Sequence, residues 1–271
     1  AAAILLLQEQ GALSVRDTLS RWLPECPEEW KPITLHHLLT HTSGIGHWRD
    51  FPALSLYQPI TRSNLLRIFQ QLPLRFPPGA GWAYSSPGYV LLAHIVEQIS
   101  GETYASFLER TILRPLGMAS AGAGNHAPQP ERQAVGYAGK KPLPSFDLDT
   151  VSIGAGDVWS TTHDLARWDE ALMMSGMLLS AESLRALFTP HAAVVEGFSE
   201  LPGAHYGYGW LVAEVGGHPV YFHPGDNSGF GALNIVLPAS DSLLILLAND
   251  EDADLWKIGQ HVLRETLGLV Y

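Results

Sequence analysis

Four histidines lie close together in the sequence and are the first candidates for chemistry. His37 and His41 are four residues apart, which places them on one face of a helix, and His36 and His47 are nearby. Imidazoles at this spacing can share a metal ion. Because no carboxylate or cysteine accompanies them on that face, we expect helix-surface or capping roles and no bound metal.

Five common catalytic signatures are missing from the 271 residues. The sequence has no G-x-S-x-G turn, no G-x-x-x-x-G-K-[ST] phosphate loop, no H-E-x-x-H, no cysteine pair for zinc and no G-x-G-x-x-G after a strand. Gly225-Asp226-Asn227-Ser228-Gly229 resembles a serine-protease string, but a polar turn between strands explains it adequately. We therefore expect no cofactor.

Several stretches, taken in order, resemble one known family. They are Ile33–Ile45, which contains LLTHTSG, Phe76–Tyr89, Arg114–Met118, Gly154–Thr161, and Tyr206–Trp210 followed by His223-Pro224-Gly225. In these stretches the chain is similar to the β-lactamase-like serine hydrolases, which include class C β-lactamases, D-alanyl-D-alanine carboxypeptidases and related esterases. The resemblance extends over nearly the whole chain.

The resemblance implies an acyl-transfer site with three elements: Ser-x-x-Lys, Tyr-x-Asn and a Lys-x-Gly or His-x-Gly strand. Tyr84 begins the second element and would pass a proton if a nearby cation lowered its pKa from about 10. Ser86 replaces the usual Asn and offers the substrate a shorter hydroxyl. His223 would orient substrate or proton traffic, and Pro224 and Gly225 continue a strand whose amides help stabilise an oxyanion.

The first element is absent from the sequence. The residues three positions before the four lysines are Glu28, Tyr137, Ala138 and Asp254, so there is no Ser-x-x-Lys. The resemblance places that element directly before the helix that begins at Ala1, where no capping side chain is present. We therefore expect a chain cut off before its nucleophile and inactive alone.

Two other interpretations of the missing nucleophile stay open. The chain could be a pseudoenzyme that keeps its cleft as a binding module, or its coding sequence could simply start late. Ser43, Ser85 and Ser228 are the only serines in the motifs considered as substitutes. Without an adjacent base a serine hydroxyl is a poor nucleophile, so we expect none of them to replace the missing one.

The elements that must position these residues follow from caps and periodicity. The pattern predicts helices at Ala1–Gln10 before Gly11, Leu35–His41 after Thr34, a segment from Thr61 to Gln71, Pro87–Ser100 before Gly101, Glu102–Leu113, Asp164–Ser175 capped by Thr162, and Ala181–Phe188. A closing helix at Asp254–Leu267 should pack through Leu255, Ile258, Val262 and Leu263.

Strands are predicted only in the last third of the chain. They are Tyr206–Val215, Val220–His223 with Phe230–Leu237, and Ser242–Asn249, with turns at Gly216-Gly217 and Pro238–Asp241. Ala119–Asp149 is rich in Gly and Pro and predicts a loop with a short ribbon. The expected fold class is α+β, a single β-lactamase-like domain over 1–271, with a mainly helical lobe at 1–200 and antiparallel strands with a helix at 201–271.

Composition limits the partners. The 46% of hydrophobic residues are enough for a folded core, and 16 basic against 27 acidic residues give a net charge of −11. With no basic run, nucleic acid is not expected as a partner. Cys26 is the only cysteine, and no apolar run spans a bilayer. No signal peptide is recognised, so the chain as written is expected to be soluble and cytoplasmic, although its compartment stays open.

The last predicted strand raises a question of assembly. The resemblance implies two N-terminal strands beside Ser242–Asn249, and neither is found in this sequence. An unpaired apolar edge invites pairing with another chain. We therefore expect a homodimer or another device that covers this edge.

Overall fold

Side-chain caps fix where most helices begin. The computed structural model describes residues 1–125, 129–173 and 177–268. Thr34 and Thr61 cap their helices as predicted, each hydroxyl accepting a hydrogen bond from the amide three residues on. The α-helices of the described residues are α1 (Ala2–Glu9), α2 (Leu35–Leu39), α3 (Arg62–Phe69), α4 (Ser86–Ser100), α5 (Tyr104–Leu108), α6 (Thr162–Met173), α7 (Ala181–Phe188) and α8 (Leu255–Leu267).

Several predicted helix boundaries need correction. The helix predicted over Leu35–His41 ends two residues earlier, at Leu39. The helix predicted to start after Thr162 includes Thr162 as its first residue, and its cap is Thr161, whose hydroxyl accepts from the Asp164 amide at 3.2 Å. Its predicted end at Ser175 lies outside the described residues. The helix predicted over Glu102–Leu113 is α5 followed by a π-helical turn, Glu109–Leu113.

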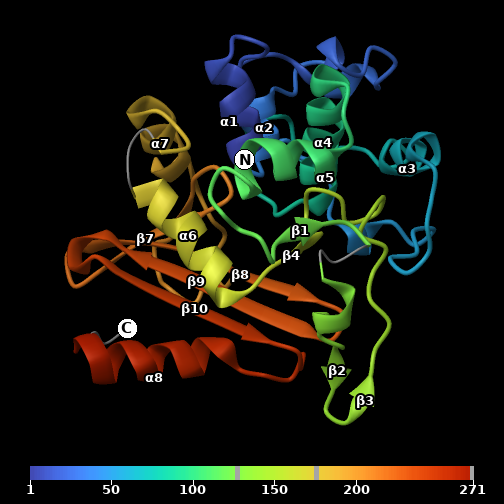
Figure 1. The fold of residues 1–271 in the computed structure, drawn as a ribbon. Helices are drawn as coiled ribbons and strands as arrows, with labels where there is room; N and C mark the ends of the chain where they lie inside the picture. Colours follow the sequence, from blue (N-terminus) through green and yellow to red (C-terminus); the bar gives the residue numbers. More distant parts are fainter. Residues whose placement is uncertain (126–128, 174–176, 269–271) are drawn as a thin grey trace.

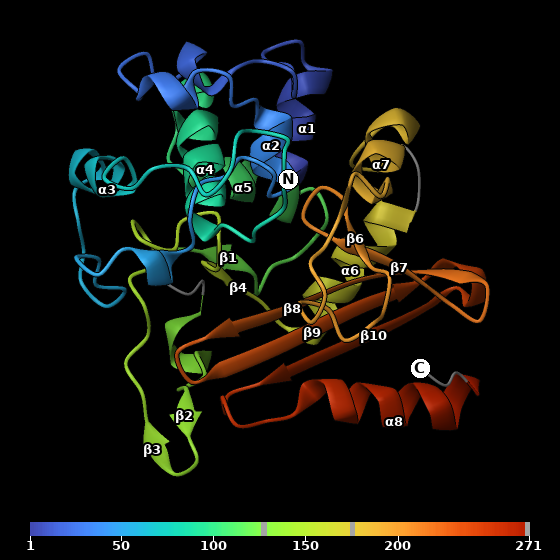
Figure 2. The ribbon, with the colours of Figure 1, turned by 180° about the vertical axis from the view of Figure 1, so that it is seen from behind.

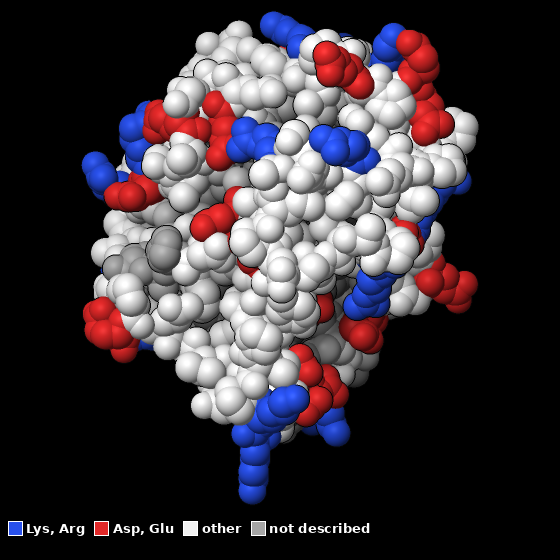
Figure 3. Space-filling view, turned by 90° about the vertical axis from the view of Figure 1, so that its right-hand side faces the viewer, with Lys and Arg blue, Asp and Glu red and all other residues white. Residues whose placement is uncertain are grey.

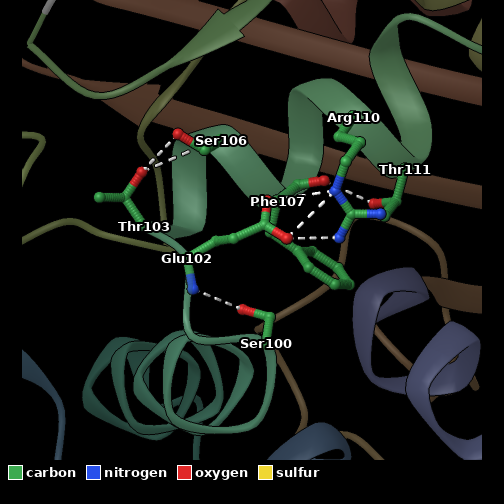
Figure 4. Close-up of polar contacts among 7 residues, drawn as sticks. All are labelled: Ser100, Glu102, Thr103, Ser106, Phe107, Arg110 and Thr111. Carbon is green, nitrogen blue, oxygen red and sulfur yellow. Dashed lines mark hydrogen bonds and ion pairs between the residues drawn. The ribbon is translucent and has the colours of Figure 1, made fainter.

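The junction between α4 and α5 is held by local polar contacts (Figure 4). Helix α4 ends at Gly101, as predicted, and the Ser100 hydroxyl then accepts a hydrogen bond from the Glu102 amide. The Glu102 carboxylate receives bonds from the Arg110 guanidinium, and this guanidinium lies 5.7 Å from the centre of the Phe107 ring. These contacts fold the start of α5 back against the end of α4, which carries the site loop at its other end.

The large sheet is antiparallel and has the strand order β10-β9-β8-β7-β6-β5. Its strands are β5 (Ala192–Ala193), β6 (His205–Tyr206), β7 (Leu211–Val215), β8 (His218–Asn227), β9 (Phe230–Leu237) and β10 (Ser242–Ala248). Two small ribbons pair β1 (Gly122–Ala123) with β4 (Val158–Trp159) and β2 (Tyr137–Ala138) with β3 (Lys141–Pro142).

The strand predictions hold with two exceptions. β9 has the predicted bounds, and β10 is one residue shorter than predicted. The strand predicted over Tyr206–Val215 is divided into β6 and β7, because residues 207–210 form a tight turn, with Gly209 at a φ of 78°, and β6 folds back to pair antiparallel with β7. The turn predicted at Gly225–Gly229 is shorter than expected, since β8 continues to Asn227.

The sheet separates two layers of helix. Figure 1 shows α8 along one face of the sheet and α6 on the other, with α1 to α5 gathered beyond it. Two apolar cores result, one within the helical lobe and one between the sheet and α8. From behind, Figure 2 shows β6 and β7 near α7, where the sheet approaches the helical lobe.

Helix α8 packs on the sheet through the predicted Leu255 and Leu263, and the prediction fails at Ile258. Leu263 is 3% exposed and Gly259 is buried, but Ile258 is 46% exposed and points away from the sheet. Gly259 allows close packing, since a Cβ there would lie 3.1 Å from a methyl group of Leu233. The predicted face was wrong at Ile258 because the sheet contacts the side of the helix that carries this glycine.

Strand β10 is an edge strand, as predicted. It pairs only with β9 among the strands of the described residues. Leu247 is 42% exposed there.

The charges visible on one side of the molecule are mixed in sign (Figure 3). None of the helices of the described residues is long and apolar enough to cross a membrane.

Leu263→Ala should destabilise the fold by about 2–5 kcal/mol, because it leaves a cavity between α8 and the sheet. Ile258→Ala on the same helix is the matched control and should change the free energy of unfolding by less than about 0.5 kcal/mol. Urea denaturation of both variants measures the difference. Equal effects would show that α8 does not dock through Leu263.

Candidate active site

A small cavity lies where the two apolar cores meet. Its volume is about 160 Å³. Tyr89 packs against the core of the helical lobe, whereas Tyr84 packs against the core of the sheet. The residues that line the cavity are Tyr84, Ser86, Tyr89, Gly154, Ala155, Tyr206, Gly209 and His223. The structure thus brings together three of the five predicted site residues, Tyr84, Ser86 and His223.

Ser85 anchors the loop that carries Tyr84. Its hydroxyl accepts a hydrogen bond from the Gly88 amide at 3.1 Å, which caps α4, and donates to the Gly46 carbonyl at 3.0 Å. Its amide donates to Nδ1 of His41 at 3.1 Å. Ser85 is 1% exposed, so each of these bonds is shielded from water. The loop is therefore held rigidly at the N-terminus of a fifteen-residue helix.

Tyr84 lies within a group of rings. Its ring centre is 4.2 Å from that of His41, 5.3 Å from that of Phe198 and 6.1 Å from that of His223. Burial, with a smaller contribution from the charge of Asp226, raises the pKa of Tyr84 to about 12. The phenol therefore keeps its proton at neutral pH in this environment.

His41 is a site residue that the sequence reasoning missed. It is 1% exposed and has a φ of 60°, so it lies beyond the end of α2 and not on a helix surface. Burial holds its pKa well below the ordinary value. It remains neutral, and its Nδ1 accepts the bond from the Ser85 amide while its ring packs against Tyr84. The positive φ and the burial leave no pattern in the sequence that could have indicated this role.

The neighbouring histidines have different contacts. His37 has the capping role that was expected, because its Nδ1 accepts a hydrogen bond from the Thr34 amide at 3.1 Å. His36 contacts the Tyr208 hydroxyl at 2.8 Å. Among the described residues, no three His, Cys, Asp or Glu side chains gather closely enough to hold a metal ion.

His223 lies on β8 directly after the last residue that pairs with β7. β7 pairs with β8 only as far as Phe222, whereas β9 pairs with it through Asn227. Among the described strands, the backbone of His223–Asn227 is thus free on the side that faced β7. Nε2 of His223 lies 3.0 Å from the Tyr206 hydroxyl, and burial lowers its pKa.

Pro224 and Gly225 line a second, larger cavity of about 770 Å³. His223 and Gly154 line both cavities, so the two spaces adjoin there. The remaining two predicted site residues therefore lie beside the small cavity and not in it. Asp226 and Asn227 follow them along the wall of the larger cavity.

The beginning of α1 also approaches the small cavity. A Cβ on Gly209 would lie 3.3 Å from the Cβ of Ala1 and 3.3 Å from the Tyr89 hydroxyl. Gly209 has a φ of 78°, so both its conformation and this close approach favour glycine. This crowding brings Ala1, Tyr89 and the Tyr206–Trp210 segment together at one wall.

The serines considered as substitute nucleophiles are held in structural roles. Ser43 is 1% exposed and its hydroxyl accepts from the Ile45 amide, and Ser85 is the cap of α4. Ser228 is 6% exposed, and its hydroxyl lies 3.5 Å from that of Tyr57. Ser43, Ser85 and Ser228 do not line the small cavity. Ser86 does, and it is 4% exposed.

Asp157 is a buried acid beside the larger cavity. It is 2% exposed, and burial raises its pKa to about 7, with the charge of Asp149 adding to the effect. Backbone hydrogen bonds from Gly154 and from Asp157 itself oppose this increase. The carboxyl group thus titrates close to neutral pH within the Gly154–Thr161 segment.

Comparisons with known proteins identify the family to which the chain belongs. The sequence model of the Beta-lactamase family matches residues 1–265. The putative penicillin-binding protein PbpX of Bacillus subtilis is 33% identical over 264 residues, covering 96% of this chain and 61% of PbpX. The D-alanyl-D-alanine-carboxypeptidase/endopeptidase AmpH of Escherichia coli is 28% identical, covering 87% of this chain and 64% of AmpH. The chain thus spans less than two thirds of the length of either relative.

A solved structure has the same fold. The D-stereospecific amidohydrolase from Streptomyces sp. superimposes with a TM-score of 0.81 at 26% sequence identity, covering 98% of this chain and 83% of that one. The α+β arrangement predicted from the sequence is confirmed by this match and by the observed sheet.

Asp157→Asn should remove a contribution that lowers stability as the pH rises. An unfolded Asp loses its proton near its ordinary value of 3.8, but folded Asp157 keeps it up to about pH 7. The folded state binds more protons between these values, so its stability falls as pH rises, by about 1.4 kcal/mol per pH unit from this group.

Urea denaturation of the wild type and Asp157→Asn at about pH 5 and about pH 7 tests this slope. Glu214→Gln, which removes an exposed carboxylate on β7, is the control and should keep the wild-type slope. An unchanged slope in Asp157→Asn would mean that Asp157 is ionised in the folded protein across this range.

Proposed function

The chain belongs to the β-lactamase family. From that premise we propose that it carries two of the three elements of an acyl-transfer site. We also propose that these 271 residues alone are inactive. The family is one of serine hydrolases related to penicillin-binding proteins. We propose as substrate class the cell-wall D-peptides, β-lactams or simple esters that such sites cleave.

One observation carries the proposal: Tyr84, from the loop before α4, and His223, from β8, line one cavity with Ser86. The free edge of β8 from His223 onward supports it further. Unpaired amides on such an edge are suited to bind a substrate carbonyl and to stabilise the oxyanion that forms on it. Pro224 has no amide hydrogen, and successive amides of a strand point to opposite edges, so the donors on the free edge come from every second residue after His223.

Tyr84 would act as the group that passes a proton between nucleophile and leaving group. A phenol whose pKa is about 12 does this at neutral pH only when a cation lies close enough to favour the phenolate. The small cavity is lined by eight residues, all within the described ranges, and none is Lys or Arg. A Ser-x-x-Lys element would supply both the missing cation and the missing nucleophile.

The 271-residue chain should not form a covalent adduct with a fluorescent penicillin and should not accelerate hydrolysis of p-nitrophenyl acetate. Loss of a nucleophile removes several orders of magnitude of rate. Gel fluorescence and absorbance measure the two outcomes. Labelling of this chain would contradict the proposed inactivity.

A longer version of the chain, with a Ser-x-x-Lys turn directly before Ala1, is the positive control for these two assays. We expect it to be labelled, and Tyr84→Phe in that version to lower the rate by about 10²–10⁴-fold. Tyr57→Phe, at a tyrosine that is 52% exposed, is the matched control and should leave the rate unchanged. Equal rates for the two variants would exclude Tyr84 from the proton transfer.

The second candidate function is binding: the chain would keep the cleft and bind a substrate-like ligand without cleaving it. The observation that favours it is the combination of an intact Tyr84–His223 cavity with motif serines held in structural roles. Calorimetry with an acylated D-alanyl-D-alanine peptide separates the candidates. Saturable binding by the 271-residue chain without acylation would favour the binding module.

We also propose a homodimer through the exposed edge of β10. This strand pairs only with β9 among the described strands, and an unpaired apolar edge favours pairing with a second copy. Size-exclusion chromatography with light scattering should give the mass of a dimer. Leu247→Lys should weaken it, since charges on edge strands oppose pairing. A monomer with the edge uncovered would contradict this proposal.

A further inference from the structure

Helix α6 is joined to the large sheet by a buried polar pair. Asp169 on α6 is 0% exposed, and its Oδ1 accepts a hydrogen bond from Nδ2 of Asn234 on β9 at 2.8 Å. Figure 1 shows α6 on the face of the sheet opposite α8, and the helix packs there against β10. Apart from Asn234 and Ser242, β9 and β10 consist of apolar residues and glycine. The pair is therefore a polar contact inside an apolar contact surface.

No cation lies against the carboxyl group of Asp169. β9 and β10 contain no ionisable residue, and on α6 Arg167 pairs with Asp164 at 2.8 Å while His163 is exposed. No ion pair of the described residues includes Asp169. The charge that acts on it is that of Glu170, the next residue of α6, and it has the same sign. An ionised Asp169 would thus be a buried charge with one hydrogen bond and no counter-ion, which is strongly unfavourable.

The hydrogen bonds of the pair also lack one hydrogen. Oδ2 of Asp169 and Oδ1 of Asn234 are buried and have no hydrogen-bond partner among the described residues. A carboxylate oxygen and an amide oxygen are both acceptors, so neither can satisfy the other. A proton on Oδ2 turns this oxygen into a donor, and the amide oxygen of Asn234 is an acceptor that needs one. Protonation therefore satisfies what ionisation leaves unsatisfied.

We propose that Asp169 is held as a protonated carboxylic acid and that it is a positioning residue, which keeps α6 docked on the sheet through Asn234. The segment before α6 depends on this docking, because the Thr161 hydroxyl accepts a hydrogen bond from the Asp164 amide at 3.2 Å and caps the helix. Residues of that segment line both cavities, Gly154 among them, and Asn234 lines the larger one. The pair thus holds a shared wall of the two cavities in place.

The docking of α6 should weaken as pH rises. Burial is the main cause that raises the pKa of Asp169 from its ordinary value of 3.8 to about 7, and the hydrogen bond from Asn234 opposes the increase. Undocking exposes the carboxyl group, whose O–H bond then breaks near the ordinary value and gives its proton to water. The docked state binds more protons between these two values, so the undocked fraction rises by about tenfold per pH unit there. If the proposed function holds, the site wall is most firmly held in acid.

Asp169→Asn tests the proposal because an amide has the shape of the neutral acid and cannot ionise. Hydrogen exchange of peptides from α6, read by mass spectrometry and corrected for the intrinsic exchange rate, measures the undocked fraction at about pH 5 and about pH 7. Over this interval the wild-type fraction should rise about 50-fold more than that of Asp169→Asn. Glu170→Gln, which removes the exposed carboxylate next to it, is the matched control and should keep the wild-type rise. Equal rises in wild type and Asp169→Asn would overturn the proposal.

A second measurement does not need a substitution at position 169. In Asp157→Asn, which removes the other buried aspartate whose pKa is raised to about 7, one aspartate carboxyl group should still be protonated at about pH 6. Carbon-13 NMR of aspartate-labelled protein detects it through the chemical shift of the carboxyl carbon. Finding every aspartate ionised at that pH would overturn the proposal. Neither measurement involves acylation or a ligand, so its failure is distinct from a failure of the proposed function.

Discussion

The arrangement of the site depends on the contacts of one buried serine. Ser85 joins three segments at once: its hydroxyl caps α4 and bonds to Gly46, and its amide bonds to His41. Each bond is buried, so losing any of them would leave an unsatisfied polar group at a cost of about 1–3 kcal/mol. Tyr84 precedes Ser85 directly, and its position in the cavity therefore follows from a capping interaction. The LLTHTSG stretch and the tyrosine loop act as one unit for this reason.

The second constraint is the early end of the β7–β8 pairing. Residues 207–210 form a tight turn that folds β6 back beside β7, so the pairing of β7 with β8 starts only at Leu211. The backbone beyond Phe222 is consequently free on one side where it reaches His223. The same turn allows Gly209 to approach Tyr89 and Ala1 closely. One irregularity in the sheet thus provides both the open edge and the wall of the cavity.

Much of this fold could be predicted from the sequence because its helix boundaries are local. Thr34, Thr61 and Gly101 mark helix ends through interactions within one turn, and their positions in the structure agree with the prediction. Ile258 was misplaced because periodicity does not determine which of two adjacent apolar stripes meets the sheet. His41 was missed because its role depends on a positive φ and on residues more than forty positions away. Tyr84 and His223 were assigned to the candidate site through the motifs. Tyr89 and Tyr206 lie in the same matching stretches but were given no role, because their place in the cavity wall follows from tertiary contacts.

The titratable groups of the small cavity are all uncharged at neutral pH. Burial raises the pKa of Tyr84, Tyr89 and Tyr206 and lowers that of His41 and His223, so each group is held in its neutral form. Neutral groups in a poorly solvated space screen a new charge weakly, and a single cation brought there interacts strongly with all of them. Such a cavity is stable without charge but responds sharply to one. For the proposed proton transfer through Tyr84, two groups beside the cavity could place such a charge: the beginning of α1 at Ala1, which lies against Gly209, and the ring of His223.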